Sequence, residues 1–274
     1  MYFRHTRQIN CPLLIAALLL TGGLRAETVL ERPQVKAVQI NALPAWDNVF
    51  SDSSWQKAGV TALSLQAPSN VTFPTPPEKT QVRVLWCKDF LLVRFDCNDQ
   101  SIVHLPGSDA AMGARDLLYF KADAVEVFLD PVGDGRMYME FEFSPNNGIF
   151  DAIYFCTTTP RSKADFSLED DVASRDLFTI KEWNLAGLRT AARIWPDSEG
   201  HGWSVIAAFP AKEILHRLGK TEFVPGMEMK LNFVRFNYFS DARHPREITN
   251  WAPVLAGCAH ISPAGMGTLV LGGQ

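Results

Sequence analysis

Apolar and polar residues alternate along much of the middle of this 274-residue chain. In the stretch 137–143, methionines and phenylalanines fall on one side, and Tyr138, Glu140 and Glu142 fall on the other. Side chains of a strand point alternately to opposite faces, so this pattern predicts strands with one apolar face. About nine or ten strands are expected. The clearest cover residues 81–86, 91–97, 124–129, 137–143, 149–156, 191–195, 203–209, 229–239 and 268–271.

Residues 211–218 are the one segment with helical spacing. Pro210 precedes them and Gly219 follows them, and these residue types are typical of a helix start and a helix end. Many alternating strands and a single short helix indicate two antiparallel sheets packed face to face. The expected fold class is therefore an all-β, two-sheet antiparallel sandwich of the jelly-roll or immunoglobulin-like kind.

The composition is that of an ordinary globular domain. Hydrophobic residues make up 47% of the chain and charged residues 20%, which excludes a disordered or coiled-coil protein. The 30 acidic residues outnumber the 26 basic ones, and the net charge is −4. Binding to nucleic acid depends on basic groups that neutralise phosphates, so nucleic acid is not an expected partner.

Residues 1–26 have the layout of a secretory signal peptide. Arg4 and Arg7 precede an apolar run at 12–20, and small residues follow it. The run is shorter than the ~20 apolar residues that a transmembrane helix requires, so no transmembrane segment is expected. We therefore expect residues 27–274 to form a single domain that is secreted or periplasmic.

Four cysteines follow the signal segment, and an exported protein can form disulfides. They are Cys87, Cys97, Cys156 and Cys258. Cys87 lies near a turn and Cys97 at the far end of the next strand, about 30 Å away at ~3.3 Å per residue. A disulfide needs Cα atoms within ~7 Å, so this pair is disfavoured and the other pairings stay open.

Carboxylates are frequent between residues 123 and 134. Asp123 and Glu126 are three residues apart in a predicted strand and so point to opposite faces, which disfavours an acid–base pair for glycoside hydrolysis. A carboxylate in this strand is either a hydrogen-bonded structural group, or a metal ligand or acceptor for sugar hydroxyls. Asp130 and Asp134 are either calcium ligands or part of a hairpin turn, since a glycine follows Asp134.

The sequence contains no motif for nucleophilic catalysis. GxSxG, the phosphate-binding loop and the dinucleotide fingerprint are absent, and the six histidines show no metal-binding spacing. The 7 Trp and 18 Phe are plentiful, and aromatic faces stack on the C–H faces of sugar rings. The loop-rich segment 250–267 contains Trp251 and His260 and is a candidate surface site. We expect no catalytic residues, which favours a non-catalytic protein.

Several short fragments along the chain form a pattern in their order and spacing. They include Asp123-Ala-Val-Glu-Val-Phe-Leu-Asp130, Tyr138-Met-Glu-Phe-Glu-Phe143, Gly202-Trp-Ser-Val205 and Gly267-Thr-Leu-Val-Leu271. Their order and spacing over residues 35–272 resemble carbohydrate-binding module family 9-like domains. The resemblance implies a β-sandwich that binds carbohydrate, in some members at chain ends, and calcium in some members. A secreted protein of this kind would serve in polysaccharide utilisation.

The resemblance also implies which residues hold the sugar. In the family, two aromatic side chains enclose the sugar, while a glutamate, an arginine and amides bind its hydroxyls. Phe120 takes the first aromatic position, Glu126 the glutamate position and His260 the second aromatic position. The family's arginine is missing from its usual place, and Arg235 or Arg246 is the candidate substitute. The expected carbohydrate-binding residues, converging on one rim, are therefore Phe120, Glu126, Arg235, Trp251 and His260.

Three other functions stay open. A sandwich that has lost its sugar-binding aromatics would be a structural or partner-binding domain of the cell envelope. A haem-binding redox sandwich has a similar fold, and a glycoside hydrolase would need paired carboxylates. Convergence of Phe120, Glu126 and His260 would favour carbohydrate binding over these alternatives.

Overall fold

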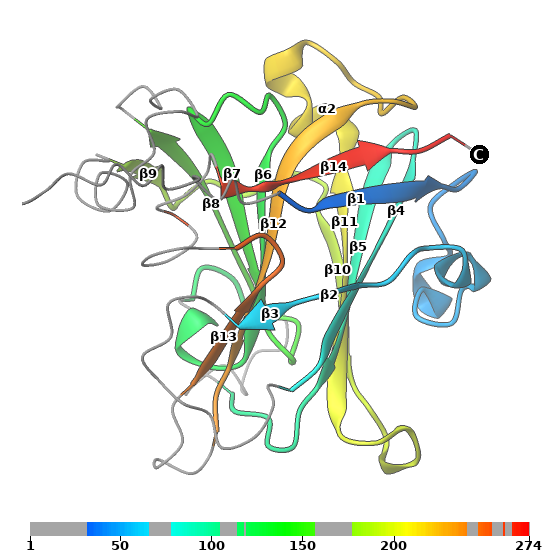
Figure 1. The fold of residues 1–274 in the computed structure, drawn as a ribbon, viewed down its shortest axis with the longest axis vertical. Helices are drawn as coiled ribbons and strands as arrows, with labels where there is room; N and C mark the ends of the chain where they lie inside the picture. Colours follow the sequence, from blue (N-terminus) through cyan, green and yellow to red (C-terminus); the bar gives the residue numbers. More distant parts are fainter. Residues whose placement is uncertain are drawn as a thin grey trace, which may run out of the picture. The chain divides into compact units, whose positions relative to one another are not determined.

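The structure is a computed structural model, and it describes residues 32–65, 78–104, 114–117, 119–156, 177–239, 246–253, 260 and 265–273, without the side chains of Leu65, Phe120 and Leu177. Residues Arg32–Gln274 form one compact unit (Figure 1). The expected signal peptide and Cys258 lie outside the described residues. Within those residues, no helix is long and apolar enough to cross a membrane.

In the described part of the chain, 14 strands form one continuous sheet. They are β1 (Gln34–Gln39), β2 (Thr61–Ala62), β3 (Ser64–Leu65), β4 (Thr80–Cys87), β5 (Phe90–Asn98), β6 (Ala124–Asp130), β7 (Met137–Phe143), β8 (Ile149–Cys156), β9 (Leu177–Ile180), β10 (Arg189–Ile194), β11 (Gly202–Pro210), β12 (Glu228–Asn237), β13 (Glu247–Asn250) and β14 (Gly267–Leu271). The short 3-10 helices outside the α2 region are η1 (Trp46–Asn48), η2 (Ser53–Gln56), η3 (Tyr119–Lys121) and η5 (Asp197–Glu199). The predicted all-β class is therefore confirmed.

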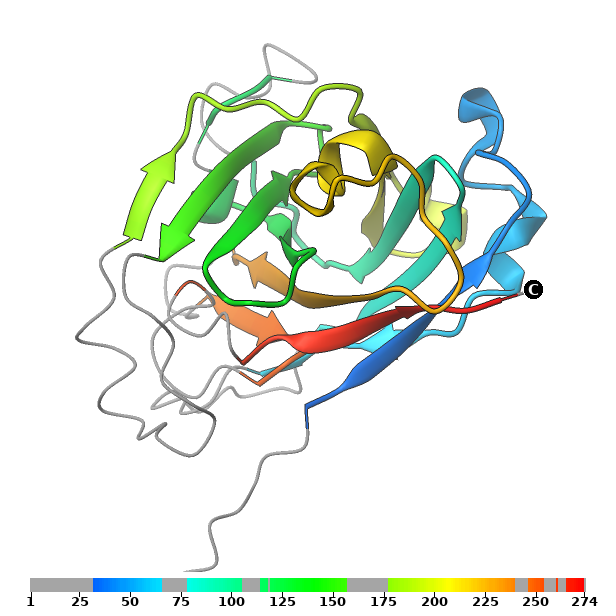
Figure 2. The same ribbon diagram turned by 90° about the horizontal axis from the view of Figure 1, so that it is seen from above.

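Strand β1 joins two halves of this sheet. Neighbouring strands follow the order β10-β11-β5-β4-β1-β14-β12-β6-β7-β8-β9. Strand β1 pairs in parallel with β14 through residues 34–37 and in parallel with β4 through residues 38–39. The two separate antiparallel sheets that the sequence predicts are therefore one curled, mixed sheet (Figure 2). We call β4, β5, β11 and β10 the β5 half, and β12, β6, β7 and β8 the β7 half.

The hydrophobic core lies between the two halves. The ring centroids of Phe95 on β5 and Phe233 on β12 are 5.6 Å apart, and those of Phe209 on β11 and Phe141 on β7 are 4.8 Å apart. The Met and Phe residues of β7 all belong to this core, as their alternation predicts. The residues between them therefore point to the outer face of the β7 half.

The predicted helix at 211–218 forms as two short pieces. Helix α2 covers Ala211–Ile214, and the 3-10 helix η6 covers His216–Leu218. Ile214 and Leu215 are buried in the core cluster. Gly219 ends the segment with a φ of 63°, a left-handed conformation that glycine adopts without steric cost.

Cys87 and Cys97 lie at opposite ends of the β4–β5 hairpin, as the sequence predicts. Cys87 is paired with Phe90 beside the turn, and Cys97 is paired with Thr80 at the other end. Both cysteines are buried and no disulfide joins them. Burial raises the pKa of the Cys97 thiol to about 12, so this side chain behaves as a small apolar group.

Candidate functional site

Three glutamates meet on the outer face of the β7 half. Glu126 lies on β6, directly opposite Glu142 on the neighbouring β7. Glu140 is two residues before Glu142 and so shares its face. One carboxylate oxygen from each of the three lies within 4.8 Å of the others. We call Glu126, Glu140 and Glu142 the glutamate cluster.

The glutamate cluster is buried, with Glu126 exposed to only 4%. Like charges away from water are costly unless they gain partners. Glu140 gains two, because Tyr154 Oη donates to its Oε2 at 2.6 Å and His260 Nε2 lies 3.1 Å from its Oε1. Burial, followed by the charge of Glu140, raises the pKa of Tyr154 far above its usual value. The Tyr154 phenol therefore stays protonated and remains a donor.

His260 connects the glutamate cluster to the surface. The rings of Tyr138 and Tyr154 stack with centroids 5.1 Å apart, and the His260 ring lies 4.6 Å from that of Tyr154. Tyr138 Oη and His260 Nδ1 are 3.0 Å apart. The His260 side chain is 27% exposed, whereas Glu140 is buried. A ligand that approaches this face can therefore reach the His260 ring.

This face combines oxygen acceptors with aromatic rings. Buried carboxylates form strong hydrogen bonds with hydroxyl donors, because the surroundings screen their charge weakly. Three carboxylate oxygens at close spacing also suit a hard divalent cation. The residues are therefore chemically suited to a polyhydroxylated ligand, and the glutamate cluster contains oxygen ligands that could hold a cation.

Two of the predicted sugar contacts, Glu126 and His260, come together at this face. Both lie beside Glu140. The backbone of Phe120 belongs to η3, a few residues before β6, and its side chain lies outside the described residues. The structure thus brings together the two described residues that the resemblance assigns to the glutamate and second aromatic positions.

Arg235 does not join them, which corrects the expectation of one rim. It lies on the inner face of β12 and is 1% exposed. Its guanidinium donates to Thr80 Oγ1 at 3.1 Å, to Asp99 Oδ2 at 3.2 Å and to Asn237 Oδ1 at 2.8 Å. Because side chains alternate along β12, the neighbouring Val234 faces Glu126 while Arg235 links the two halves.

Trp251 is also a core residue rather than a surface contact. Its ring centroid lies 5.5 Å from that of Phe233, and it belongs to the core between the halves. A Cβ on Gly267 would lie 2.5 Å from the Trp251 ring, so this position requires glycine. The predicted sugar contact at Trp251 is therefore corrected to a packing role.

Asp130 and Asp134 shape a turn, and their contacts do not fit the expected calcium site. Asp130 Oδ1 accepts from the backbone N–H groups of Val132 and Gly133, and its Oδ2 accepts from that of Gly135. Both Asp130 carboxylate oxygens are thus occupied by N–H donors, and these donors stand where a bound cation would have to lie. Asp134 caps the same turn through Arg136 N. The described geometry supports the hairpin-turn alternative.

Asp123 matches the structural alternative for the acidic strand. Its Oδ1 accepts from Tyr238 N at 2.7 Å, and its Oδ2 accepts from Val103 N. Burial, and then the charge of Asp99, raises the pKa of Asp123 to about 7. This carboxylate therefore fixes backbone segments at one end of the fold and takes no part in the glutamate cluster.

Glu140, Glu142, Tyr138 and Tyr154 complete the site, although the sequence alone did not assign them to it. The available signal was the alternation in β7, which places Tyr138, Glu140 and Glu142 on its non-core face. Strands β7 and β8 pair so that Tyr138 lies opposite Tyr154. The pairing register, which the sequence does not specify, was the missing information.

No protein-family model matches this sequence, and no curated protein matches it. Solved structures do match. A proposed carbohydrate-binding protein from Bacteroides uniformis superposes with a TM-score of 0.61 and 16% identity, over 88% of this chain and 100% of that chain. A family 9 carbohydrate-binding module from Caldicellulosiruptor kristjanssonii was solved with cellotriose and with glucose. These structures give TM-scores of 0.54 and 0.55 at 15% identity, over 88% of this chain and 95% and 97% of those chains. The likeness establishes a family 9-like fold, as the resemblance implied.

Proposed function

We propose that this chain, with its carbohydrate-binding module family 9-like fold, is an exported carbohydrate-binding protein. Its sugar site is the outer face of the β7 half. The observation that carries this proposal is the convergence of Glu126 and His260, with Tyr138 and Tyr154, on one face. The fold neighbours include a module solved with glucose and with cellotriose. Polysaccharide utilisation is the corresponding biological role.

The chemistry of this face suits a sugar in two ways. The partly exposed His260 ring offers an aromatic surface to the C–H face of a pyranose. The glutamate cluster offers acceptors for the hydroxyls at the ring edge, and a charged acceptor forms hydrogen bonds about twice as strong as a neutral one. Phe120, which lies six residues before Glu126, is proposed to be the first aromatic of the pair, with His260 as the second. Binding at a chain end would place a terminal ring against this face.

The proposed role is binding without catalysis. Both oxygens of Glu140 have partners in Tyr154 and His260, so Glu140 acts as a group that positions these side chains. The competing function is glycoside hydrolysis, which the close carboxylates of Glu126 and Glu142 would favour, since retaining enzymes place two carboxyls ~5–5.5 Å apart. Product analysis separates the two functions.

Calorimetric titration of the full chain with glucose, cellotriose and xylo-, manno- and chito-oligosaccharides tests the proposal. Glu126→Gln and His260→Ala should each weaken binding at this face at least about tenfold, as expected when a central contact is removed. The matched controls are Glu228→Gln and His216→Ala, two exposed residues outside the glutamate cluster and its aromatic rings. Thermal melts verify that the variants are folded.

Two outcomes would overturn the proposal. One is unchanged affinity in both site variants when the wild-type chain binds an oligosaccharide. The other is release of shorter sugars from the same oligosaccharides, measured by a reducing-end assay, which would establish hydrolysis. Binding without cleavage, lost in the site variants alone, is the expected result.

A further inference from the structure

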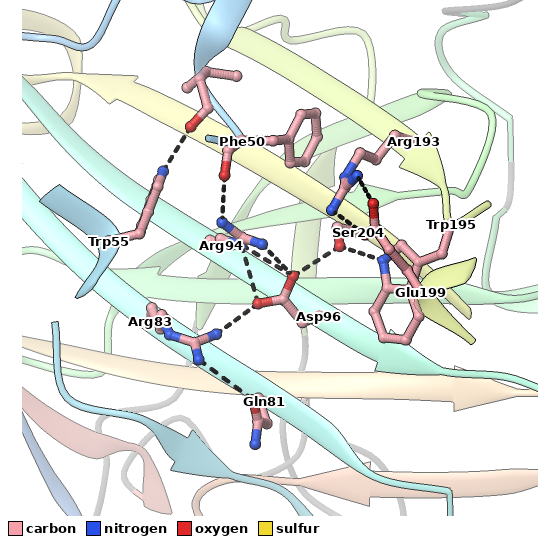
Figure 3. Close-up of polar contacts among 11 residues, drawn as sticks. Phe50, Trp55, Gln81, Arg83, Arg94, Asp96, Arg193, Trp195, Glu199 and Ser204 are labelled. Atoms are coloured by element: carbon pink, nitrogen blue, oxygen red, sulfur yellow. Dashed lines mark hydrogen bonds and ion pairs between the residues drawn. The ribbon is translucent and has the colours of Figure 1, made fainter. Parts of the chain in front are cut away.

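A hollow lies on the outer face of the β5 half. It encloses about 560 Å³. Its floor consists of Gln81 and Arg83 from β4 and Arg94 and Asp96 from β5 (Figure 3). One wall is formed by residues 50–52, Trp55 and Gln56. Sites for small ligands commonly enclose ~300–1,000 Å³, so the hollow is large enough for a sugar unit or two.

Asp96 organises the floor of this hollow. It accepts from Arg83 Nη1 at 2.6 Å, from Arg94 Nε at 2.9 Å and from Ser204 Oγ at 2.7 Å (Figure 3). Arg94 also donates to the carbonyl of Phe50 at 2.8 Å, which ties the wall to the floor. The arginines are therefore held in place before any ligand arrives, and a pre-organised site loses less entropy on binding.

Trp195 forms the opposite wall, and contacts with Gly202 and Ser204 fix the orientation of its ring. A Cβ on Gly202 would lie 2.6 Å from the Trp195 ring and 2.2 Å from the carbonyl of Cys97, so only glycine fits beneath this ring. The indole N–H donates to Ser204 Oγ at 2.7 Å. Trp195 is half-buried and lines the hollow. It therefore offers a fixed aromatic platform, the feature that a sugar ring stacks on.

Arg193 and Glu199 lie beside this platform. Glu199 accepts from both terminal nitrogens of Arg193, at 2.8 and 3.2 Å. The Arg193 guanidinium also lies 5.3 Å from the Phe50 ring centroid. Arg193 Nε is buried without a hydrogen-bond partner among the described residues. Exposed ion pairs add little stability. Stabilising the fold is therefore a weak explanation for the Arg193–Glu199 pair beside Phe50.

The charges of the lining balance. Three arginines face the carboxylates of Asp52, Asp96 and Glu199. Phosphate-rich ligands need an excess of positive charge, which this lining lacks. A surface with an aromatic platform, fixed N–H donors and carboxylate acceptors suits a neutral ligand with many hydroxyls. A neutral saccharide has that chemistry.

We propose that this hollow, between the Trp195 platform and the Arg83–Asp96 floor, is a second site for a neutral saccharide. It shares the ligand class of the proposed function but rests on its own residues. The glutamate cluster and this hollow lie on the outer faces of halves that pack core to core, so the two sites face away from each other. One chain could then bind two sugar chains, or two places on one polysaccharide, with a gain in avidity.

Titration of the full chain with the same neutral oligosaccharides tests this site. Trp195→Ala and Gln81→Ala should each weaken binding at the hollow, by at least about tenfold for Trp195→Ala, and lower the stoichiometry from two sites to one. Gln81 is exposed, so its substitution should leave the fold intact. Trp183→Ala, a half-buried tryptophan outside the hollow, is the control for loss of an indole.

The pattern of loss separates the two proposals. Binding that is lost in Trp195→Ala and Gln81→Ala but kept in His260→Ala supports the hollow even if the proposed sugar site fails. Binding that is lost in His260→Ala alone, with one site in the wild type, overturns the second site and leaves the proposed function standing. Absence of binding to every oligosaccharide overturns both.

Discussion

Among single residues, the face and the partners of a buried charged side chain decide its role. Arg235 and Glu126 are both buried charged groups, yet Arg235 faces the core and Glu126 faces outward. A sequence shows that both are charged but does not show which partner each one finds. Arg235 is therefore a structural residue, while Glu126 remains a proposed ligand contact.

Arg235→Met should destabilise the fold by about 3–5 kcal/mol, because the substitution leaves the buried Asp99 carboxylate without its guanidinium partner. Urea unfolding measures this loss. The exposed Arg217→Ala is the control and should change the free energy of unfolding by less than about 0.5 kcal/mol. A folded Arg235→Met of wild-type stability that no longer binds sugar would instead restore Arg235 as a sugar contact.

Asp123 should make stability depend on pH. Its pKa rises from 3.8 to about 7 on folding, so the folded protein keeps a proton that the unfolded chain releases in this range. The contribution of Asp123 to the free energy of unfolding is therefore greatest below about pH 4 and falls as the pH rises to about 7. Asp123→Asn should remove this fall in denaturant titrations between pH 4 and 8.

Asp134→Asn serves as the control for that experiment, since its side chain is partly exposed at the turn. It should keep the wild-type dependence on pH. An equal slope in wild type and Asp123→Asn would show that the Asp123 carboxyl does not hold its proton in the folded state.

At the element scale, alternation predicted the strands well where one face is apolar. Strands β4 to β8, β10 to β12 and β14 all lie near their expected positions. Strands β2 and β3 have two residues each, and β9 and β13 have four, so they are too short to show a period. β1 alternates weakly, and its parallel pairing with two distant strands depends on tertiary packing.

The turn after β6 is the element that a calcium site would have occupied. Asp130→Ala should cost about 1–3 kcal/mol, because it leaves backbone donors of the turn without their acceptor. The melting temperature measures the loss.

Calcium binding at this turn is tested with Asp134→Ala. The change in melting temperature on adding EDTA should be the same in Asp134→Ala as in the wild type. A smaller EDTA effect in Asp134→Ala would establish calcium at this turn.

At the scale of the whole molecule, the functional faces depend on which strands become neighbours. Glu126 and Glu142 lie on consecutive strands and meet because β6 and β7 pair. Trp195 and Arg83 line one hollow because β10, β11, β5 and β4 lie side by side. The resemblance could indicate Glu126 and His260, since it carries register information from related folds. The resemblance assigned no residue to the hollow on the β5 half, so the sequence did not predict it.

A crystal structure of the full chain with a bound neutral oligosaccharide is the decisive experiment for the proposed sugar site on the outer face of the β7 half. We expect sugar hydroxyls within hydrogen-bond distance of the Glu126 carboxylate and a sugar ring against His260. An oligosaccharide bound elsewhere, with the glutamate cluster and His260 untouched, would contradict this proposal.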